Sequence, residues 1–237
     1  IPIYNEQDNI IQLIKEIRVA LEKKINYEII IVDDGSNDNT FEVLNKSKKY
    51  ITILSHKKNY GQSIGLQTGI IAANSKHIVT LDGDGQNDPR DILKLIKAFD
   101  VKVDFMMVIG NRVNRVDSLA KKVASRLAFR IRKFFLKDNT PDTGCAIKLF
   151  KKKDFQQLPF FNHIHRFLPF LFSAFGGKII SIPVNHRSRK NGISKYSNFQ
   201  RFLVGITDLY GVIWLRKRSI WPILKKTNKH LKIKEKK

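Results

Sequence analysis

Two short acidic clusters each follow a run of apolar residues, and carboxylates placed in this way could hold a divalent cation. Asp82-Gly83-Asp84 follows residues 77–81, and Asp33-Asp34 follows residues 28–32. Apolar β-branched runs of about five residues, ended by Gly and Asp, are typical of buried parallel strands. Ligands of open α/β sheets bind beyond the carboxyl ends of the strands. The clusters therefore predict a cation site that holds a diphosphate, as in an enzyme acting on a nucleotide-activated substrate.

The Asp82-Gly83-Asp84 cluster suits a hard cation. Mg²⁺ usually takes one or two carboxylates together with substrate phosphates. Gly83 would let the backbone approach a bound nucleotide, and Gln86 could supply an amide to the same site. Two aspartates around one residue also occur in ordinary turns. Their position at a strand end, with a helix start at Asp88-Pro89, favours the ligand interpretation.

The Asp33-Asp34-Gly35-Ser36 segment allows two interpretations. It could be an Asx-rich turn that caps the next helix, or one of its carboxylates could accept hydrogen bonds from a base or a ribose. Pro2, Tyr4 and Glu6 follow the first strand, so we expect them at the same edge of the sheet.

Strand and helix patterns alternate through the first hundred residues, which predicts a parallel sheet with helices on both faces. Beyond residue 100 the pattern is looser. The expected strands are residues 1–3, 28–32, 51–54, 77–81, 105–109, 147–150 and 179–184, and the expected helices are residues 9–23, 61–73 and 117–136 with two more opening near 39 and 88.

The charge is unevenly distributed along the chain. Residues 1–100 carry 13 Lys/Arg and 14 Asp/Glu, whereas residues 101–237 carry 31 and 7, so nearly all of the net charge of +23 lies in the second part. Such a basic region indicates an anionic partner, namely nucleic acid, acidic lipid or a phosphorylated substrate. A lysine-rich solvated surface would account for part of the excess.

The cysteine content and the absence of long apolar stretches limit the class of protein. A single cysteine, Cys145, excludes an internal disulfide and suits a reducing compartment. We expect it to be a small packing residue. No stretch reaches the roughly 18 apolar residues that span a bilayer, and no signal peptide is recognisable. The chain starts at Ile1-Pro2-Ile3 without Met, within an expected strand, so we expect a fragment trimmed at its N-terminus.

Four motifs occur in a fixed order in the first hundred residues, and further pieces follow at 110–112, 142–145, 165–169, 186–196 and 208–215. The ordered set resembles family 2 glycosyltransferases with the GT-A fold. It is most similar to the branch of dolichol-phosphate mannose synthases and polyprenyl-phosphate glycosyltransferases, and the likeness covers nearly the whole chain. The four motifs are I-P-I-Y-N-E, D-D-G-S-x-D-x-T, N-Y-G-Q-x-x-G-L-x-x-G and D-G-D-G-Q-N-D-P.

The resemblance implies an α/β fold, the Rossmann-like GT-A fold, with a mostly parallel sheet flanked by helices. A C-terminal helical region would bind the acceptor and face the membrane. One glycosyltransferase domain would span 1–215, with a nucleotide-sugar half at 1–100 and an acceptor half at 101–215. Residues 216–237 would be a basic tail.

The resemblance also assigns roles to residues. Mg²⁺ or Mn²⁺ would be held by Asp82, Asp84 and Gln86. The residues that would contact the nucleotide sugar are Pro2, Tyr4, Glu6, Asp33, Asp34, Asp82 and Gln86. The residues that would carry catalysis, mostly by meeting the acceptor's phosphate, are Asp84, Arg112, Lys121, Ser125, Arg189 and Lys195, with Lys122 and Arg187 beside them. Lysines precede Ser125 where the family often has Arg, which puts a bidentate phosphate grip there in doubt.

The function implied is inverting transfer of a mannose- or glucose-like sugar from a GDP- or UDP-sugar to a dolichyl or undecaprenyl phosphate. A phosphate monoester is already an anion at neutral pH and needs no general base, whereas a hydroxyl acceptor usually does. The implied location is peripheral, at the cytoplasmic face of the membrane, or the cytoplasm if the protein is not membrane-bound. A separate subunit could provide the membrane anchor.

Three other functions are alternatives. A family 2 enzyme acting on a saccharide hydroxyl in cell-surface polysaccharide synthesis would need a base, for which Asp117 and Asp142 are the candidates. A nucleotidyltransferase usually shows a Gly-rich phosphate loop where this chain has Tyr4-Asn5-Glu6. A nucleic-acid-binding domain would suit the pI of about 10.1, but helix-turn-helix, zinc and RNP signatures are missing. We therefore expect no nucleic-acid partner.

Two further groups have competing interpretations. His163, His165 and His186 have the wrong spacing and surroundings for a metal cluster, and His165-Arg166 is expected to order the acceptor loop. The phenylalanines of residues 160–175 predict either a core-facing helix or a surface that dips into the bilayer interface. Residues 199–215, followed by Arg216-Lys217-Arg218, invite the same membrane interpretation.

Overall fold

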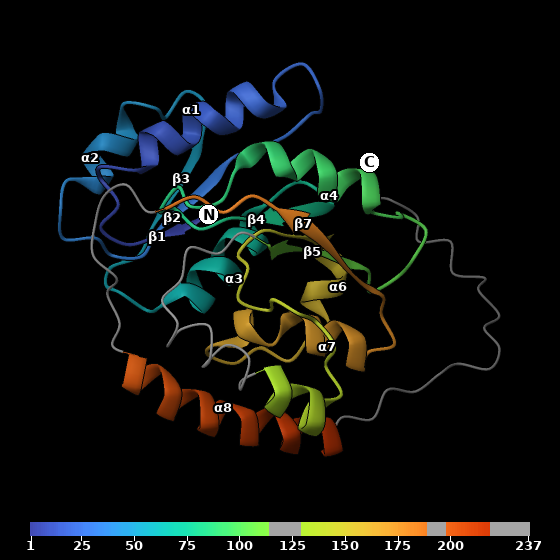
Figure 1. Cartoon of the computed structure of the whole chain (residues 1–237). Helices are drawn as coiled ribbons and strands as arrows, with labels where there is room; N and C mark the ends of the chain where they lie inside the picture. Colours follow the sequence, from blue (N-terminus) through green and yellow to red (C-terminus); the bar gives the residue numbers. More distant parts are fainter. Residues whose placement is uncertain (114–128, 189–197, 219–237) are drawn as a thin grey trace, which may run out of the picture.

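A computed structural model describes residues 1–113, 129–188 and 198–218. It has a layered α/β architecture in which strands in the middle are covered by helices on both sides (Figure 1). Helices α1, α2 and α4 lie above the strands, and α3, α6 and α7 lie below them. Helix α8 runs along the outside of the lower layer. The α/β fold predicted from the sequence is thus confirmed.

The first sheet is entirely parallel. It consists of β1 (Pro2–Ile3), β2 (Ile30–Asp33) and β3 (Thr52–Ser55), in that order. The register pairs Pro2 with Val32, and Ile30 with Thr52. Because the strands are parallel, the loops after β1 and β2 leave the sheet at the same edge.

The second sheet has the order β4-β6-β5-β7. Its strands are β4 (His77–Thr80), β5 (Met107–Arg112), β6 (Lys148–Lys151) and β7 (Ile179–Val184). Strand β6 is antiparallel to β4 and β5, whereas β7 is parallel to β5. Because β4 comes from the first hundred residues and pairs with β6, the two expected halves of the chain interlock in one sheet.

Helical periodicity explains most of the helices. In α1 (Ile10–Leu21) the apolar residues recur every three or four positions, and those residues are buried. The Asp88 side chain accepts a hydrogen bond from the Arg90 backbone N–H at 3.0 Å, and Pro89 opens the following turn. The remaining helices are α2 (Thr40–Asn45), α3 (Gln62–Ala72), α4 (Ile92–Ala98), α6 (Lys152–Gln156), α7 (Leu168–Ala174) and α8 (Asn198–Arg218), with 3-10 turns at Pro89–Asp91 and Ile164–Arg166 and a helical stretch at 129–136.

Strand β5 begins two residues later than the sequence predicts. Phe105 has a φ of 51°, which is outside the β region, so it lies in a turn. Its N–H donates to the Asp154 carboxylate at 2.9 Å, which fixes that turn. The strand extends to Arg112, so Arg112 is its last residue.

The phenylalanine-rich segment is part of the core, so the core-facing alternative is confirmed for it. Phe167, Phe170 and Phe172 are buried, and Phe160, Phe161 and Phe175 pack against the same cluster. The membrane interpretation of residues 160–175 is therefore wrong. These rings are needed to bind α7 to β5 and β6, where Phe150 contacts Phe172 with ring centroids 5.5 Å apart.

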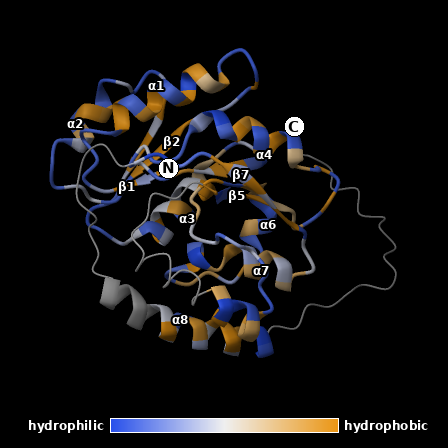
Figure 2. Ribbon diagram, viewed as in Figure 1, coloured by the Kyte–Doolittle hydropathy of each residue, from blue (hydrophilic) through white to orange (hydrophobic). Residues whose placement is uncertain are grey.

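Helix α8 differs from that segment. Val212 is buried against the core, whereas Tyr210 and Trp214 are 71% and 62% exposed. Figure 2 shows hydrophobic and hydrophilic residues alternating along this helix. In the parts of the chain that the structure describes, no helix combines the length and the apolar character needed to cross a bilayer.

Candidate active site

The Asp82–Asp84 turn leaves the carboxyl end of β4 and touches the end of β1. A Cβ atom added at Gly83 would lie 2.3 Å from Cγ2 of Ile3, so a side chain at this position would collide with β1. The glycine thus allows close approach to a neighbouring strand, and the approach of a nucleotide to its backbone stays a prediction. Gly85 has a φ of 71°, and the turn closes with the Gln86 N–H donating to the Asp84 carboxylate at 3.1 Å.

Asp82 and Asp84 form a strained electrostatic pair. Burial, reinforced by the nearby charge of Asp84, raises the pKa of Asp82 to about 6, although Lys148 and Arg112 act in the opposite direction. The Gln62 side chain donates to Asp82 at 2.7 Å. A carboxylate whose charge is disfavoured by a neighbouring carboxylate is suited to a divalent cation, which would relieve the repulsion. The donor set therefore fits Mg²⁺ or Mn²⁺ held jointly with a ligand's phosphates.

Protein groups alone do not build a complete metal cage here. Within residues 1–113, 129–188 and 198–218, no three His, Cys, Asp or Glu side chains converge in a way that could hold a metal ion. His165 contacts the Ser63 hydroxyl at 2.7 Å, and His163 lies 3.0 Å from the Asp208 carboxylate on α8.

Gln86 links the acidic turn to the segment after β7. Its side-chain amide donates to the Arg187 carbonyl at 3.3 Å, and its own carbonyl accepts the Arg187 N–H at 2.9 Å. An isolated bridge between Asn87 and His186 continues this pairing. The structure thus places Gln86 beside the acidic turn, with its amide on a backbone carbonyl, and its expected part in holding the metal stays a prediction.

The loops after β1 and β2 lie together, as the sequence predicts for one edge of a sheet. The Asn5 N–H donates to the Ser36 hydroxyl, and the Glu6 N–H donates to the Thr40 hydroxyl, each at 2.9 Å. Glu6 is buried and accepts from the Asn9 amide at 2.8 Å. These bonds bring Tyr4 and Glu6 next to the Asp33 turn.

The carboxylates of Asp33 and Asp34 accept hydrogen bonds from other groups of the protein. Asp33 accepts from both the N–H and the hydroxyl of Ser36, at 3.1 and 2.5 Å, which is the Asx-type turn of the first interpretation. Asp34 accepts from His56 Nδ1 at 2.7 Å and from the N–H groups of Tyr60 and Gly61 at 3.0 and 2.7 Å. A carboxylate has about four acceptor positions, so Asp34 chiefly fixes the loop before α3. Nucleotide contacts by Asp33 and Asp34 stay predictions.

The side chain of Pro2 also packs against other parts of the protein. It is buried in β1, and a Cβ atom at Gly65 of α3 would lie 2.8 Å from its Cβ. The side chain therefore faces α3, and its role is to hold the strand that carries Tyr4 and Glu6. Its expected contact with a nucleotide stays a prediction.

Arg112 forms an ion pair with Asp142. Its Nε and Nη2 atoms lie 2.7 Å from the two carboxylate oxygens in a bidentate arrangement. Arg112 is 15% exposed and Asp142 is 6% exposed at the side chain. Burial alone would lower the pKa of Arg112, but hydrogen bonding to Asp142 raises it. The expected contact of Arg112 with a phosphate would compete with this pair, and Asp142 is poorly placed as a general base because its charge is held by the guanidinium.

Arg187 is likewise held by acidic groups. Its guanidinium lies 2.5 Å from Glu16 of α1 and 3.0 Å from Asp88. Asp88 also binds Arg90, and although burial opposes ionisation, these arginines lower the pKa of Asp88 to about 2. The pairs bind the segment after β7 to α1 and to the residue that follows the acidic turn. The role of Arg187 in the described structure is therefore to hold these segments together.

Lys148 is a buried cation that the sequence analysis missed. It lies on β6, is 4% exposed, and donates to the Cys145 carbonyl. Burial lowers its pKa, Asp82 and Asp142 oppose that change, and the nearby charge of Arg112 adds to it. Its only signal in the sequence was a lysine between two apolar residues of an expected strand. Cys145 is fully buried in the core, so its expected role in packing is confirmed.

Six of the predicted residues lie outside the part of the chain that the structure describes. They are the candidate base Asp117 and the residues expected at the acceptor's phosphate, Lys121, Lys122, Ser125, Arg189 and Lys195. The described part therefore holds the acidic turn, the β1 and β2 loops and the Arg112–Asp142 pair. It shows one end of the predicted site in atomic detail and leaves the phosphate-binding end a prediction.

Comparison with known proteins relates this arrangement to sugar transfer. The family model for glycosyl transferase family 2 matches residues 1–158. Similar solved structures include glucosyl-3-phosphoglycerate synthase from Mycobacterium tuberculosis with Mn²⁺, UDP-glucose and phosphoglyceric acid, at 16% identity over 91% of this chain and 77% of that one, with a TM-score of 0.64. The same synthase with Mg²⁺ and UDP matches at 15% identity over 91% and 76%, with a TM-score of 0.65. At these identities the likeness establishes the GT-A fold.

Proposed function

This chain belongs to glycosyl transferase family 2, and we propose that it transfers a sugar from a UDP- or GDP-sugar to an acceptor that carries a phosphate, with the help of Mg²⁺ or Mn²⁺. The observation that carries the proposal is the Asp82–Asp84 pair at the end of β4, where burial and mutual repulsion raise the pKa of Asp82 to about 6. This pair lies beside the β1 end, against which Gly83 packs.

Asp82 and Asp84 would hold the cation, and Gln86 is beside them. A bound cation would stabilise the negative charge that develops on the departing nucleoside diphosphate. Gln62, which donates to Asp82 at 2.7 Å, orients that carboxylate. The presence of Mn²⁺ or Mg²⁺ in the structurally similar synthase supports this assignment.

The donor is a nucleoside diphosphate sugar. The β1 and β2 loops, with Tyr4, Glu6 and Asp33, line the side of the acidic turn where a nucleoside would lie. The similar synthase binds UDP and UDP-glucose, which supports UDP as the nucleotide. The resemblance to the dolichol-phosphate branch keeps GDP as the second choice.

For the acceptor we propose a polyprenyl phosphate. Its phosphate is already anionic, so the reaction requires cationic groups that hold it in place and no general base. Among the described residues Asp142 was a candidate base, and it is bound by Arg112 at 2.7 Å. The strongly basic second part of the chain, with Lys121, Arg189 and Lys195, supplies cations for the acceptor.

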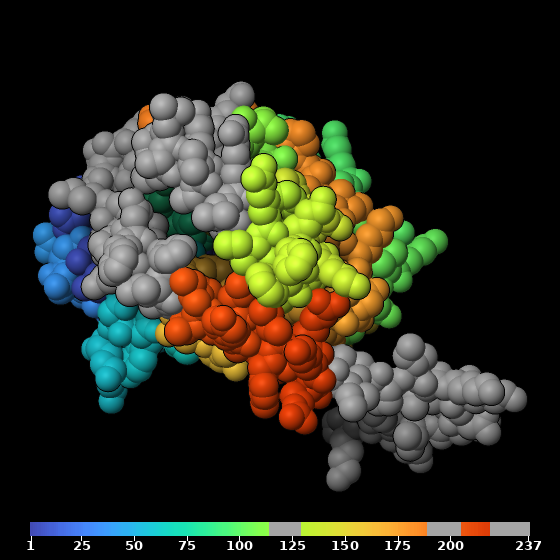
Figure 3. All heavy atoms as spheres, turned by 60° about the horizontal axis from the view of Figure 1, so that its bottom comes forward, coloured from blue at the N-terminus to red at the C-terminus, as the bar shows by residue number. Residues whose placement is uncertain are grey.

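The lipid acceptor implies a membrane surface as partner. Phe134, Phe135, Tyr210 and Trp214 are all exposed. They belong to the stretch 129–136 and to α8, which lie side by side on one face of the molecule (Figure 3) and are joined by a hydrogen bond from Arg216 to the Phe135 carbonyl. Aromatic rings next to Arg216, Lys217 and Arg218 suit the headgroup region of an anionic membrane. We therefore propose a peripheral location at the cytoplasmic membrane face, with or without an anchoring subunit.

A second acceptor class is a small phosphorylated acid. It is favoured by one observation, the fold similarity to a synthase that binds phosphoglyceric acid. Both classes present a phosphate to the cationic part of the site, but only the lipid would use the exposed aromatic rings of α8.

The test is a transfer assay with UDP-glucose or GDP-mannose and either polyprenyl phosphate or 3-phosphoglycerate as acceptor. We expect transfer to the lipid that requires Mg²⁺ or Mn²⁺ and is lost in Asp84→Asn. Asp100→Asn is the matched control, because Asp100 is exposed and its hydrogen bond from the Lys102 N–H can be kept by the asparagine oxygen. Transfer to 3-phosphoglycerate alone would replace the lipid by the small acid, and full activity of Asp84→Asn would refute the metal site.

A further inference from the structure

The carboxylate of Asp82 is held by a residue at the start of helix α3. Gln62 is the first residue of that helix, and its side-chain amide donates to Asp82 Oδ1 at 2.7 Å. Hydrogen bonds of this kind fix the orientation of a metal-binding carboxylate, and their loss commonly lowers metal affinity by about 10–100-fold. The position of the first turn of α3 therefore bears on the proposed metal site.

The first turn of α3 contacts the 3-10 turn η2 (Ile164–Arg166). Ser63, the second residue of the helix, is buried, and its hydroxyl lies 2.7 Å from His165 Nδ1. Asn162, which precedes η2, lies against the helix start, since a Cβ atom added at Gly61 would be 4.0 Å from Asn162 Oδ1. A polar contact and a packing contact thus join η2 to the start of α3.

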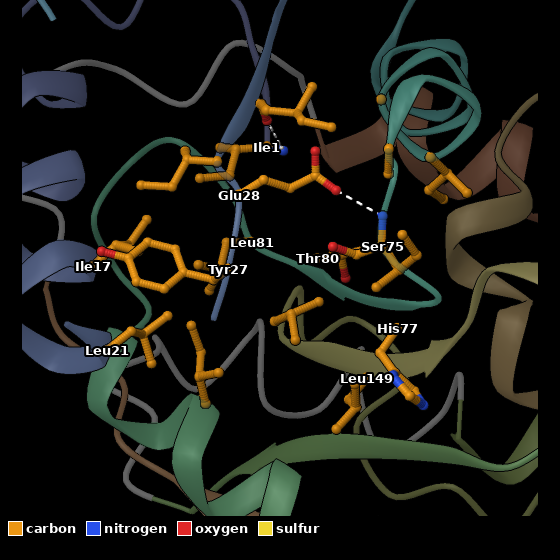
Figure 4. A pocket seen from close by; sticks show the side chains of 18 of the residues that line it. Ile1, Ile17, Leu21, Tyr27, Glu28, Ser75, His77, Thr80, Leu81 and Leu149 are labelled. Atoms are coloured by element: carbon orange, nitrogen blue, oxygen red, sulfur yellow. Dashed lines mark hydrogen bonds between the residues drawn. The ribbon is translucent and has the colours of Figure 1, made fainter. Parts of the chain in front are cut away.

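Helix α3 is also held where the chain enters it and where the chain leaves it. Before the helix, the Asp34 carboxylate accepts from the Gly61 N–H at 2.7 Å. After the helix, the Glu28 carboxylate accepts from the Ser75 N–H at 2.8 Å, at the rim of an apolar cavity (Figure 4). A helix fixed at both ends moves little as a whole, so its contact with η2 sets the local position of the first turn.

Helix α8 holds η2 from the other side. His163, directly before η2, lies 3.0 Å from the Asp208 carboxylate on α8, and Arg166 lies 3.9 Å from the same carboxylate. Val212, one helical turn after Asp208, is buried in the core, so the two residues share the inner face of α8. Trp214 is exposed on another face. One face of α8 thus holds η2, and another carries the proposed membrane contact.

The backbone of His163 adopts a left-handed conformation, with φ of 66° and ψ of 10°. This conformation is unfavourable for residues other than glycine, and it persists where the surrounding structure fixes it. Here the contact with Asp208 lies on one side of His163, and the Asn162 side chain accepts its N–H at 2.9 Å. Glycine would adopt the same backbone conformation without strain, so the imidazole can be removed without disturbing the backbone.

We propose that His163, His165 and Ser63 are positioning residues for the metal site. They transmit the placement of α8 through η2 and the first turn of α3 to Gln62, which orients the Asp82 carboxylate. These three residues touch neither the metal nor the substrate, and their effect on metal binding passes through the Gln62 side chain. The inference rests on the proposed function, because it takes Asp82 as a metal ligand.

The test measures the dissociation constant of Mn²⁺ by electron paramagnetic resonance of the free ion, with UDP or GDP in excess, whichever the unaltered protein binds. We expect Gln62→Met to weaken Mn²⁺ binding by at least about tenfold. Ser63→Ala and His163→Gly should each weaken it by about threefold or more. The melting temperature of His163→Gly should stay within about 4 °C of the unaltered protein, because glycine suits the left-handed backbone.

The double variants separate positioning from a general effect on the fold. If the contacts act through Gln62, their loss has no further effect once Gln62 is changed. Gln62→Met combined with Ser63→Ala or with His163→Gly should therefore bind Mn²⁺ as Gln62→Met alone does. Two controls make the same changes elsewhere, and both should leave Mn²⁺ binding unchanged. They are Ser173→Ala, at an exposed residue of α7, and Lys23→Gly, at an exposed residue with φ of 62°.

Unchanged Mn²⁺ binding in any of the three single variants would overturn the inference and would leave the metal site itself in place. Losses that multiply in the double variants would also overturn it, because the contacts would then act on the fold and not through Gln62. If the unaltered protein binds no Mn²⁺ with either nucleotide, the proposed function fails and this inference fails with it.

Discussion

Among the described residues, Arg112 and Arg187 near the site are paired with carboxylates, whereas the acidic turn brings two carboxylates together. Arg112 is paired with Asp142, and Arg187 is paired with Glu16 and Asp88. Asp82, in contrast, lies beside another carboxylate, Asp84, and the nearby cations offset its burial only in part. A raised pKa of this kind is typical of a functional site.

The consequence for stability can be measured with Asp82→Asn in the unliganded protein. The pKa of Asp82 is raised from 3.8 to about 6, so the folded state binds its proton more tightly than the unfolded chain does. Its contribution to stability is therefore present at low pH and is lost as the pH rises through about 6. At pH 7.5 we expect Asp82→Asn to stabilise the protein by about 1–3 kcal/mol, and at about pH 3, below the ordinary value of 3.8, we expect little difference.

The measurement is the free energy of unfolding in urea at both pH values, without metal. Asparagine can still accept the Gln62 hydrogen bond, so the comparison isolates the charge. Asp100→Asn, in an exposed loop, should change stability little at either pH. A destabilised Asp82→Asn at pH 7.5 would show that the carboxylate is already well compensated.

The strands position the site by touching at their carboxyl ends. Gly83 packs against Ile3, and the loop after β1 is tied to the loop after β2 by hydrogen bonds from Asn5 and Glu6. The metal-binding turn and the nucleotide-binding loops are thus fixed relative to each other by backbone packing. A small displacement between β1 and β4 would be transmitted directly to the site.

Gly83→Ala tests this coupling. The added methyl group would lie 2.3 Å from Ile3 Cγ2, so the turn must move away from β1. Overpacking of this kind costs about 1–3 kcal/mol of stability, and misplacement of catalytic groups by about 1 Å can lower transfer about 100-fold. Gly211→Ala on α8 is the matched control, because its new methyl group would meet no atom within 4 Å.

Melting temperature and the rate of sugar transfer are the two measurements. We expect both to fall in Gly83→Ala and neither to fall in Gly211→Ala, where alanine favours the helix. A Gly83→Ala protein with unchanged activity would mean that the turn adjusts without help from β1.

The molecule as a whole separates its charges along the chain. Residues 1–100 are nearly neutral, and the remainder carries almost all of the net charge of +23. In the described part, α8 places Lys217 and Arg218 next to the exposed Trp214. Long-range attraction to an anionic surface and insertion of aromatic rings would then act on the same face.

Vesicle binding tests that face. Each basic residue near an anionic membrane contributes about 1 kcal/mol, so Lys217→Gln combined with Arg218→Gln should weaken binding to phosphatidylglycerol-containing vesicles by about 30-fold. Lys48→Gln combined with Lys49→Gln, exposed before β3, removes the same charge elsewhere and should have little effect. Co-sedimentation at low and high salt measures both. Equal losses in the two double variants would indicate attraction by net charge alone.

The sequence was sufficient for much of the fold and for the location of the acidic site. Alternating apolar runs and helical periods predicted the order of strands and helices, because burial of one face imposes a period that can be read from residue types. The Gly-Asp turns after residues 28–32 and 77–81 predicted which ends of the strands carry polar groups. These features are local, and nearby residues specify them.

The tertiary structure decided which polar groups are bound by other parts of the protein. Arg112 and Asp142 are thirty positions apart, and Arg187 and Glu16 are 171 positions apart, yet each pair meets through strand pairing and helix packing. The burial of Lys148 and the contact of Gly83 with Ile3 likewise depend on elements brought together from distant segments. Residue types and spacing state which chemistry is available, but the free energy of a charge depends on its neighbours in space, and only the folded chain sets those neighbours.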